Sequence, residues 1–155
     1  MDKRIEVGEN APDFVLWDHK KQEFRLSDFK GTRVFLSFHP LAWTTVCAKQ
    51  MQSLDRHYGD FKSLNTIAVG VNVDPVPSKK AWADILGIRA TRLLSDFWPH
   101  GDVAKLFGIF REGDGFSERA NIIINEDQKI DFIKIYEISE LPNIKEILTV
   151  LERSK

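Results

Sequence analysis

The alternation of apolar and polar residues predicts short strands and helices joined by brief turns. Two β-prone segments, 14–17 and 23–26, flank the polar stretch 18–22, and this pattern predicts an N-terminal β-hairpin. Segments 33–38 and 66–73 are almost continuously apolar, which is typical of strands that are buried on both faces of a sheet. We expect these two segments to lie at the centre of the sheet.

One amphipathic helix is predicted between the two central strands. Apolar residues recur there at spacings of four, three, four and three, at Cys47, Met51, Leu54, Tyr58 and Phe61. This stripe indicates a continuous helix with Cys47 in its first turn.

The second half of the chain predicts three more helices and another pair of strands. A helix begins near Ser78, which would be its N-cap, and ends at Gly87. Residues 101–107 form a short helix, and residues 141–151 form the last one, with an apolar face at Ile144, Ile147, Leu148 and Leu151. The segments 119–125 and 129–136 form an antiparallel pair around the turn at 125–127.

The order of these elements, β-β-β-α-β-α-β-α-β-β-α, indicates an α/β fold. We expect a central mixed β-sheet flanked by helices, with the hairpin at its N-terminus. A chain of 155 residues corresponds to one domain, 1–155. Ligands of such sheets bind beyond the carboxyl ends of the strands, where loops meet helix N-termini. The segment between Phe38 and Cys47 is such a place.

Composition narrows the function classes. The formal net charge is -1, with 22 Lys and Arg against 23 Asp and Glu, which disfavours binding to nucleic acid or an anionic membrane. No apolar stretch approaches the roughly 20 residues of a membrane span. The first residues have mixed charge and no apolar segment of the kind a signal peptide requires, so we expect a cytoplasmic protein.

Cys47 is the only cysteine, which excludes a disulfide within the chain and a cysteine-built zinc site. The histidines His39, His57 and His100 show no metal-ligand spacing. We expect no metal and no cofactor.

The position of Cys47 favours thiolate chemistry. If Thr44 is the N-cap, Cys47 is the third helical residue, and its N–H is one of the unpaired donors of the first turn. Peroxide reduction would use this place, because it needs a sulfur that is ionised, exposed and surrounded by donors. Lowering a thiol pKa from about 8.5 to about 6 requires roughly 3.4 kcal/mol. A helix N-terminus supplies about 0.3–1 kcal/mol, up to about 2 when partly buried, so a cation must supply the rest. Spacing alone does not identify that cation.

The spacing Pro40-x-x-x-Thr44-x-x-Cys47 resembles the active-site signature of the peroxiredoxins, which are thiol peroxidases of thioredoxin-like fold. The signature also lies between a predicted buried strand and a helix, as it does in that family. Similar segments are spread over nearly the whole chain, at residues 8–14, 73–74, 80–82, 94–96 and 117–120. Within the family the chain is most similar to the one-cysteine and AhpE-like members.

The resemblance implies a role for each residue of the signature. Cys47 is the peroxidatic nucleophile, and the Thr44 hydroxyl with the Cys47 N–H binds the peroxide oxygens. Pro40 shields the sulfur from bulk water. Arg119 matches the family arginine that stabilises the thiolate and polarises the peroxide, so it is the missing cation.

The resemblance also implies a reaction and its partners. The Cys47 thiolate attacks the O–O bond of hydrogen peroxide or an organic hydroperoxide in line, and a sulfenic acid forms. An external thiol, either a thioredoxin-type protein or a small thiol, must regenerate the enzyme. Family habit further implies a homodimer.

Three positions depart from the common family pattern. Thr45 stands where proline is frequent, Ala48 where threonine is frequent, and Gln50 where a glutamate often orients the arginine. These departures affect the entry into the helix and the surroundings of Arg119, and none removes a residue that contacts the peroxide.

Each residue also has an ordinary interpretation. A lone cysteine on an apolar stripe is commonly a buried structural thiol, and Pro40 and Thr44 each suit a turn or an N-cap. Their joint spacing favours catalysis. His39 near the site is not needed as a base for a thiolate paired with arginine. Trp43 and Trp82 either wall a substrate pocket or belong to the core.

Two functions share this first chemical step. The chain is either a one-cysteine peroxiredoxin or a redox-sensing regulatory protein that signals through oxidation of Cys47. A thioredoxin-like disulfide reductase is disfavoured, because the chain has no Cys-x-x-Cys motif. Sustained turnover with a reductant, as against a single stoichiometric oxidation, distinguishes the first two.

Overall fold

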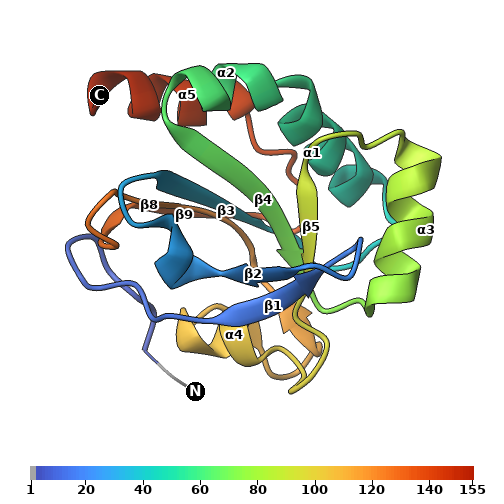
Figure 1. Cartoon of the computed structure of the whole chain (residues 1–155). Coiled ribbons are helices and arrows are strands. Elements are labelled where there is room, and N and C mark those ends of the chain that lie inside the picture. Colours follow the sequence, from blue (N-terminus) through green and yellow to red (C-terminus); the bar gives the residue numbers. More distant parts are fainter. Residues whose placement is uncertain (1–2) are drawn as a thin grey trace.

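The computed structural model describes residues 3–155. The protein has a central mixed β-sheet with helices on both faces (Figure 1). Its strands follow the spatial order β2-β1-β5-β4-β3-β8-β9. In that order their bounds are Glu23–Arg25, Val15–Asp18, Arg92–Ser95, Thr66–Asn72, Arg33–Phe38, Arg119–Ile124 and Ile130–Tyr136. The pairs β3–β4 and β4–β5 are parallel, and the other pairs of neighbours are antiparallel.

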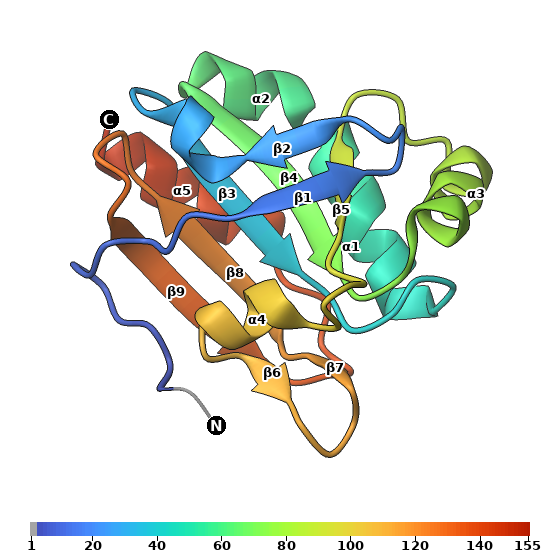
Figure 2. The same cartoon turned by 60° about the horizontal axis from the view of Figure 1, so that its bottom comes forward.

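Helices cover the two faces of the sheet unequally. One face carries four helices, and the other carries a short α-helix and the 3-10 helix η1 (Figures 1 and 2). The first four are α1 (Thr45–Arg56), α2 (Tyr58–Ser63), α3 (Val76–Leu86) and α5 (Ile144–Arg153), and the other two are α4 (Asp102–Leu106) and η1 (Leu26–Phe29). Residues Phe110–Arg111 (β6) and Phe116–Ser117 (β7) form a separate small ribbon.

The central strand β3 divides two hydrophobic cores. Val34, Leu36 and Phe38 belong to the core beneath α4, whereas Phe35 packs with α1, α2 and α5 on the other face. Because side chains alternate along a strand, Ser37 shares the face of Phe35. Ser37 is therefore a buried polar residue under α1, with 1% of its surface exposed.

The strand predictions are confirmed. The N-terminal hairpin, the two central strands and the antiparallel pair at 119–136 all form, with bounds that differ by at most one residue from those expected. The fold class, a mixed sheet flanked by helices, is confirmed as well.

The prediction of one helix through residue 61 is wrong. The apolar stripe continues across two helices that are separated at His57, where φ is -102° and ψ is 15°. The His57 ring contacts the carboxylate of Asp60 at 2.9 Å and so joins the end of α1 to the first turn of α2. After this break Tyr58 is 38% exposed, although its spacing placed it on the buried stripe.

Two helix starts also differ from the expected ones. Ser78 lies inside α3, which starts at Val76 after Pro75 in extended conformation, whereas the predicted end at Gly87 is confirmed by its left-handed φ of 73°. The last helix starts at Ile144, because the Asn143 side chain accepts a hydrogen bond from the Lys145 N–H and caps it there.

The topology brings distant parts of the sequence to one edge of the sheet. The parallel strands β3 and β4 end at the same edge, where the loop 39–44 leads into α1 (Figure 2). Strand β8 runs antiparallel to β3, and Ala120 pairs with Phe38. Arg119, the first residue of β8, therefore lies beside the end of β3 and the beginning of α1. None of the helices formed by residues 3–155 combines the length and the hydrophobicity of a membrane span.

Candidate active site

Cys47 occupies the position expected from the sequence, but its sulfur is not exposed. It is the third residue of α1 after the N-cap Thr44, whose backbone is extended. Its exposed fraction is 0%, so the expectation of an exposed sulfur is wrong. Pro40, in the loop that precedes α1, is also buried. The thiol is enclosed between the helix and the sheet.

Arg119 lies against this buried sulfur. Its Nη1 donates to Cys47 Sγ at 3.3 Å, and only 2% of the residue is exposed. Its Nε donates to the carbonyl of Ile138 at 2.9 Å, which fixes the plane of the guanidinium. A guanidinium is always charged, and its field is weakly screened away from water. The pair thus has the geometry of a cation that stabilises a thiolate.

Gln50 orients the arginine although it is an amide rather than a carboxylate. Its Oε1 accepts a hydrogen bond from Arg119 Nη1 at 2.7 Å. Its Nε2 donates to Ser37 Oγ at 2.7 Å and to the carbonyl of Phe38 at 3.2 Å. A neutral acceptor holds the guanidinium without neutralising it, so the positive charge of Arg119 stays available to Cys47.

The hydrogen bonds continue from Gln50 across the sheet to α5. Ser37 Oγ donates to Asn121 Oδ1 at 2.8 Å, and Asn121 Nδ2 donates to Tyr136 OH at 3.3 Å. Tyr136 OH donates to Glu146 Oε1 at 2.6 Å. Every donor points from the guanidinium towards the carboxylate, an arrangement in which successive hydrogen bonds polarise one another.

The contacts of Tyr136 and Glu146, at the far end of this series of hydrogen bonds, shift their pKa values. Burial, with the hydrogen bond to Glu146 as the second cause, raises the pKa of Tyr136 well above its usual value. Hydrogen bonds from Lys134 and Tyr136 lower the pKa of Glu146. The series of hydrogen bonds therefore ends on the charged carboxylate of Glu146.

Sequence reasoning did not identify Ser37, Asn121 or Tyr136. A signal for the first two was present, because each is a polar residue inside an apolar strand that is buried on both faces. Buried polar side chains require partners, which singles such positions out as members of a network.

Thr44 and Pro40 lie in the loop, but neither hydrogen-bonds to Cys47. The Thr44 hydroxyl donates to the carbonyl of Leu41 at 2.9 Å and makes no cap bond to the first turn of α1. The Thr44 hydroxyl therefore leaves the N–H groups of the first turn of α1 without a side-chain cap.

The loop itself is tied to the end of β4 and to α3. Asp74 Oδ2 accepts from the Ala42 N–H at 2.7 Å and from Asn72 Nδ2 at 2.8 Å. Trp43 has a left-handed backbone with φ of 68°, and its indole N–H donates to Ser78 Oγ at 3.0 Å. These contacts fix the backbone that surrounds the sulfur.

His39 is buried and uncharged. Its Nδ1 lies 3.3 Å from the carbonyl of Ser37, and its Nε2 has no hydrogen-bond partner within residues 3–155. Burial, followed by the charge of Lys79, lowers the pKa of His39 well below its usual value. Its ring packs 5.6 Å from that of Trp82. Within residues 3–155 no hydrogen bond joins the His39 ring to Cys47.

An apolar groove opens beside Thr44, between α1 and α3. Its volume is about 370 Å³, and its lining includes Trp43, Thr44, Thr45, Trp82 and Ile85. Trp43 is 54% exposed and forms part of the wall, whereas Trp82 is a core residue with 1% exposed. The groove lies next to the loop that carries Thr44, where a non-reacting part of a substrate has room.

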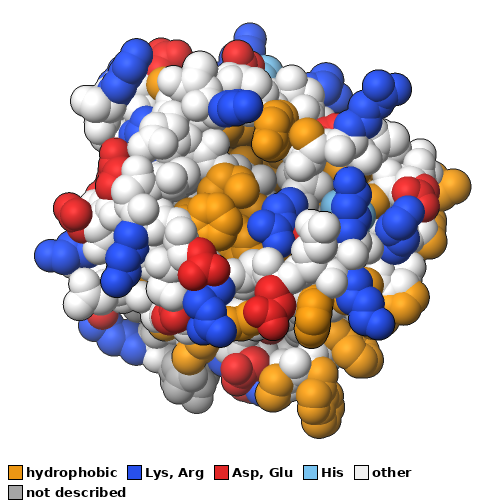
Figure 3. Space-filling view, in the orientation of Figure 1, with side chains coloured by type: hydrophobic (Ala, Val, Ile, Leu, Met, Phe, Trp, Pro, Cys, Tyr) orange, Lys and Arg blue, Asp and Glu red, His pale blue; other side chains and the backbone are white. Residues whose placement is uncertain are grey.

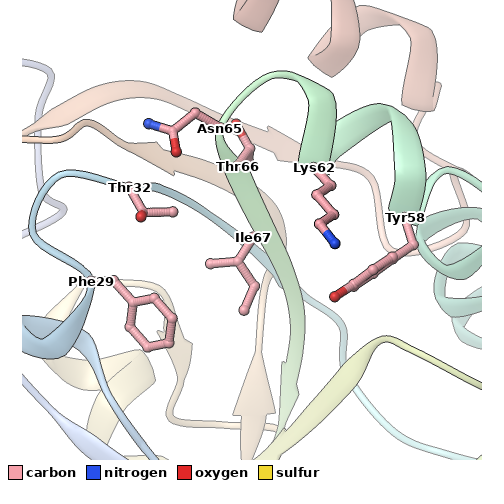
Figure 4. A pocket seen from close by; sticks show the side chains of 7 residues that line it. All are labelled: Phe29, Thr32, Tyr58, Lys62, Asn65, Thr66 and Ile67. Atoms are coloured by element: carbon pink, nitrogen blue, oxygen red, sulfur yellow. The ribbon is translucent and has the colours of Figure 1, made fainter.

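A second pocket lies at the opposite edge of the sheet. Figure 4 shows Ile67 and Thr66 of β4 at its floor, with Tyr58 and Lys62 of α2 on one side and Phe29 on the other. Its volume is about 240 Å³. It adjoins the amino end of β4, whereas Cys47 lies near the carboxyl ends of β3 and β4, so the pocket is separate from the thiol.

A buried thiol in contact with a guanidinium near the N-terminus of a helix, on a mixed sheet flanked by helices, is the arrangement that the chemistry of a thiol peroxidase requires. Comparison with known proteins agrees. Residues 7–133 match the model of the AhpC/TSA family. The chain is 35% identical over 138 residues to alkyl hydroperoxide reductase E of Mycobacterium tuberculosis strain H37Rv, covering 88% of this chain and 90% of that protein.

Solved structures give the same result. The crystal structure of Enterococcus faecalis AhpC superimposes with a TM-score of 0.88 at 26% identity, over 96% of this chain and 91% of that one. Peroxidoxin BcpB of Mycobacterium tuberculosis gives 0.85 at 25% identity, over 98% and 99%. The chain belongs to the AhpC/TSA family, and it is a thiol-dependent peroxidase of the peroxiredoxin type.

Proposed function

We propose that the protein is a one-cysteine peroxiredoxin in which Cys47 is the nucleophile and Arg119 its cationic partner. The observation that supports this most strongly is the 3.3 Å contact between Arg119 Nη1 and Cys47 Sγ, with both residues buried. In a medium of low dielectric this cation supplies the stabilisation that a helix N-terminus alone lacks.

Thr44 and Pro40 complete the proposed site. The Thr44 hydroxyl and the Cys47 N–H bind the peroxide oxygens, and Pro40 keeps bulk water from the sulfur. Because Cys47 Sγ is enclosed, peroxide reaches it only when side chains of the loop or of the first turn of α1 move aside. This small displacement is part of the proposed cycle.

The proposed reaction proceeds in two stages. The thiolate attacks one peroxide oxygen, an S–O bond forms, the O–O bond breaks, and the departing oxygen takes a proton to leave as water or an alcohol. Cys47 is thereby oxidised to a sulfenic acid. An external thiol condenses with it, releasing water and leaving a mixed disulfide, and a second thiol reduces that disulfide to free Cys47. With one cysteine in the chain, both thiols come from outside.

The choice of substrate and of reductant depends on which molecules can reach Cys47. Hydrogen peroxide and organic hydroperoxides both fit the proposed mechanism, and the apolar groove beside Thr44 supports the organic ones. The reductant is a small thiol or a thioredoxin-type protein. A reduced single thiol is typical of a reducing compartment, which supports a cytoplasmic location.

We further propose that residues 1–155 act as one domain and that two copies form a homodimer. Phe97, Trp98 and Leu106 are 45%, 81% and 44% exposed, which is unusual for large apolar side chains grouped in one segment. Figure 3 shows hydrophobic side chains at the lower edge of this face, where Figure 1 draws the segment between β5 and α4. A second copy would cover them.

A redox-sensing role for Cys47 is the alternative, and steady-state kinetics separates the two. The experiment supplies hydrogen peroxide or cumene hydroperoxide together with excess dithiothreitol or a thioredoxin system, and follows peroxide consumption. An enzyme consumes many equivalents of peroxide per chain. If consumption stops after one equivalent while reductant remains in excess, the protein is a sensor.

A further inference from the structure

Lys79 is a second buried cation near the site, and nothing in its immediate packing explains its burial. Its exposed fraction is 0%, and its Nζ donates to Asn72 Oδ1 at 2.6 Å. That is its one hydrogen-bond acceptor within residues 3–155, although an ammonium has three N–H donors. Within the same residues no carboxylate lies at salt-bridge distance from it. Burying an ammonium with so few partners is strongly unfavourable.

Its position in α3 adds to this cost. Lys79 is the fourth residue of the helix, close to the N-terminus, where the helix dipole disfavours a positive charge. The neighbouring Lys80 shows the ordinary arrangement, because it is exposed and pairs with Asp84 at 2.7 Å. The fold therefore turns one of two adjacent lysines into the interior, towards the carboxyl ends of β3 and β4.

We propose that Lys79 is a positioning residue of the peroxidase site, which stabilises the thiolate form of Cys47 from the α3 side and anchors the loop through Asn72 and Asp74. This proposal rests on the proposed role of Cys47 and adds a cation to it. Arg119 contacts the sulfur from β8, and Lys79 is a second positive charge, carried by α3, that interacts electrostatically with Cys47.

The anchoring follows from a short series of hydrogen bonds. Lys79 fixes the Asn72 amide through its Oδ1, and the same amide donates through Nδ2 to Asp74 Oδ2 at 2.8 Å. That carboxylate oxygen accepts from the Ala42 N–H in the loop. The ammonium thus determines which way the Asn72 amide points, and so whether Asp74 receives its hydrogen bond.

The electrostatic part follows from the groups that surround the amine. The ionisable side chains that interact electrostatically with it come from several parts of the fold: Cys47 on α1, Asp74 after β4, Asp96 after β5, His39 after β3 and His19 after β1. Both histidines have lowered pKa values and are neutral at neutral pH, so the negative charges dominate around the amine.

These negative charges and burial have opposite effects on the pKa of Lys79. Burial lowers the pKa of Lys79 and the charges of Asp74, Cys47 and Asp96 raise it, with a net value of about 7. Coupling between two sites is reciprocal, so a thiolate that favours the ammonium is itself favoured by the ammonium. At neutral pH the protonation of Lys79 therefore responds to the state of Cys47.

The first test replaces Lys79 with an apolar side chain of similar length and uses its neighbour as the control. In Lys79→Met we expect the pH midpoint of thiolate absorbance near 240 nm to rise by about 1 unit, the usual effect of removing a nearby opposite charge. Lys80→Met removes the same charge from the surface and should leave the midpoint and the rate of peroxide reduction unchanged. Equal midpoints in wild type and a folded Lys79→Met overturn the proposal.

The second test needs no change at Lys79. NMR titration of the lysine side chains identifies Lys79 as the amine with a midpoint near 7, well separated from exposed lysines near about 10.4. In Cys47→Ser the thiolate is lost, and we expect this midpoint to fall by about 1 unit. An unchanged midpoint overturns the proposal even if Lys79→Met does not fold. Neither readout requires turnover, so peroxide reduction by the wild type separately tests the proposed function.

Discussion

The pairing of Arg119 with Cys47 makes a direct prediction for thiolate formation. In Arg119→Met the thiolate loses its contact at 3.3 Å, and we expect the midpoint of thiolate absorbance to rise by about 1–2 pH units. Arg111→Met is the control, because Arg111 pairs with Asp114 and Glu118 on the surface. A midpoint that stays in place in Arg119→Met would assign the stabilisation to another cation.

Thr44 is predicted to act on the rate rather than on the fold. Its hydroxyl both accepts and donates hydrogen bonds, and the isosteric Thr44→Val does neither. We expect peroxide reduction in stopped-flow experiments to slow by about 10²-fold, by analogy with the loss of one oxyanion donor. Thr44→Ser should be tolerated, and Thr45→Val, at the exposed next position, should reduce hydrogen peroxide, which does not need the groove, at the wild-type rate. Wild-type rates in Thr44→Val would contradict the proposed role.

Site residues inside the motif from Pro40 to Cys47 could be predicted from the sequence, whereas residues distant from it in the sequence were harder to find. The spacing from Pro40 to Cys47 placed three residues in one loop and helix turn, and similarity alone pointed to Arg119. Lys79 could not be found this way, because a lysine in an amphipathic helix is normally solvated. Its burial results from packing between α3 and the ends of two strands, which no local pattern encodes.

Helices and strands were predictable to different degrees. The apolar runs of β3 and β4 mark them as central, since both faces of the sheet are covered. The helix after Cys47 was predicted too long, because apolar periodicity persists through His57 while the backbone does not. Helix starts depend on single capping contacts, such as Asn143 with the Lys145 N–H, and these are resolved only in three dimensions.

Asp96, which accepts hydrogen bonds from the first turn of α4, should make the stability of the fold depend on pH. Burial raises the pKa of Asp96 from 3.8 to about 6, although its carboxylate accepts from the N–H groups of Val103 and Ala104. The folded state therefore holds this proton more tightly than the unfolded state does. The resulting stabilisation is complete below about pH 4 and is lost as pH rises through about 6, amounting to about 3 kcal/mol.

Denaturant unfolding of Asp96→Asn and wild type at several pH values tests this. The difference in unfolding free energy between them should change between about pH 4 and 6 and be constant above that range. A pH-independent difference for Asp96→Asn would contradict the raised pKa.

At the scale of the whole molecule, the large apolar side chains of Phe97, Trp98 and Leu106 are exposed in a single chain. If Phe97, Trp98 and Leu106 form a homodimer interface, sedimentation should give about twice the 17.9 kDa of one chain. Trp98→Asp should shift it to the monomer, because a charge at the centre of an apolar interface is not compensated. Val7→Asp, at another exposed apolar position, is the control. A wild type that is monomeric at micromolar concentration would contradict the dimer.

The oxidation state of the single sulfur reports on the proposed cycle most directly. Intact-mass spectrometry after one equivalent of peroxide should show a gain of about 16 mass units, trapped by dimedone as a sulfenic acid at Cys47. Excess peroxide without thiol should then add about 32 units in total and inactivate the protein, and an added thiol should protect it. A covalent dimer as the main product would contradict the one-cysteine cycle, and an unchanged mass would contradict the peroxidase itself.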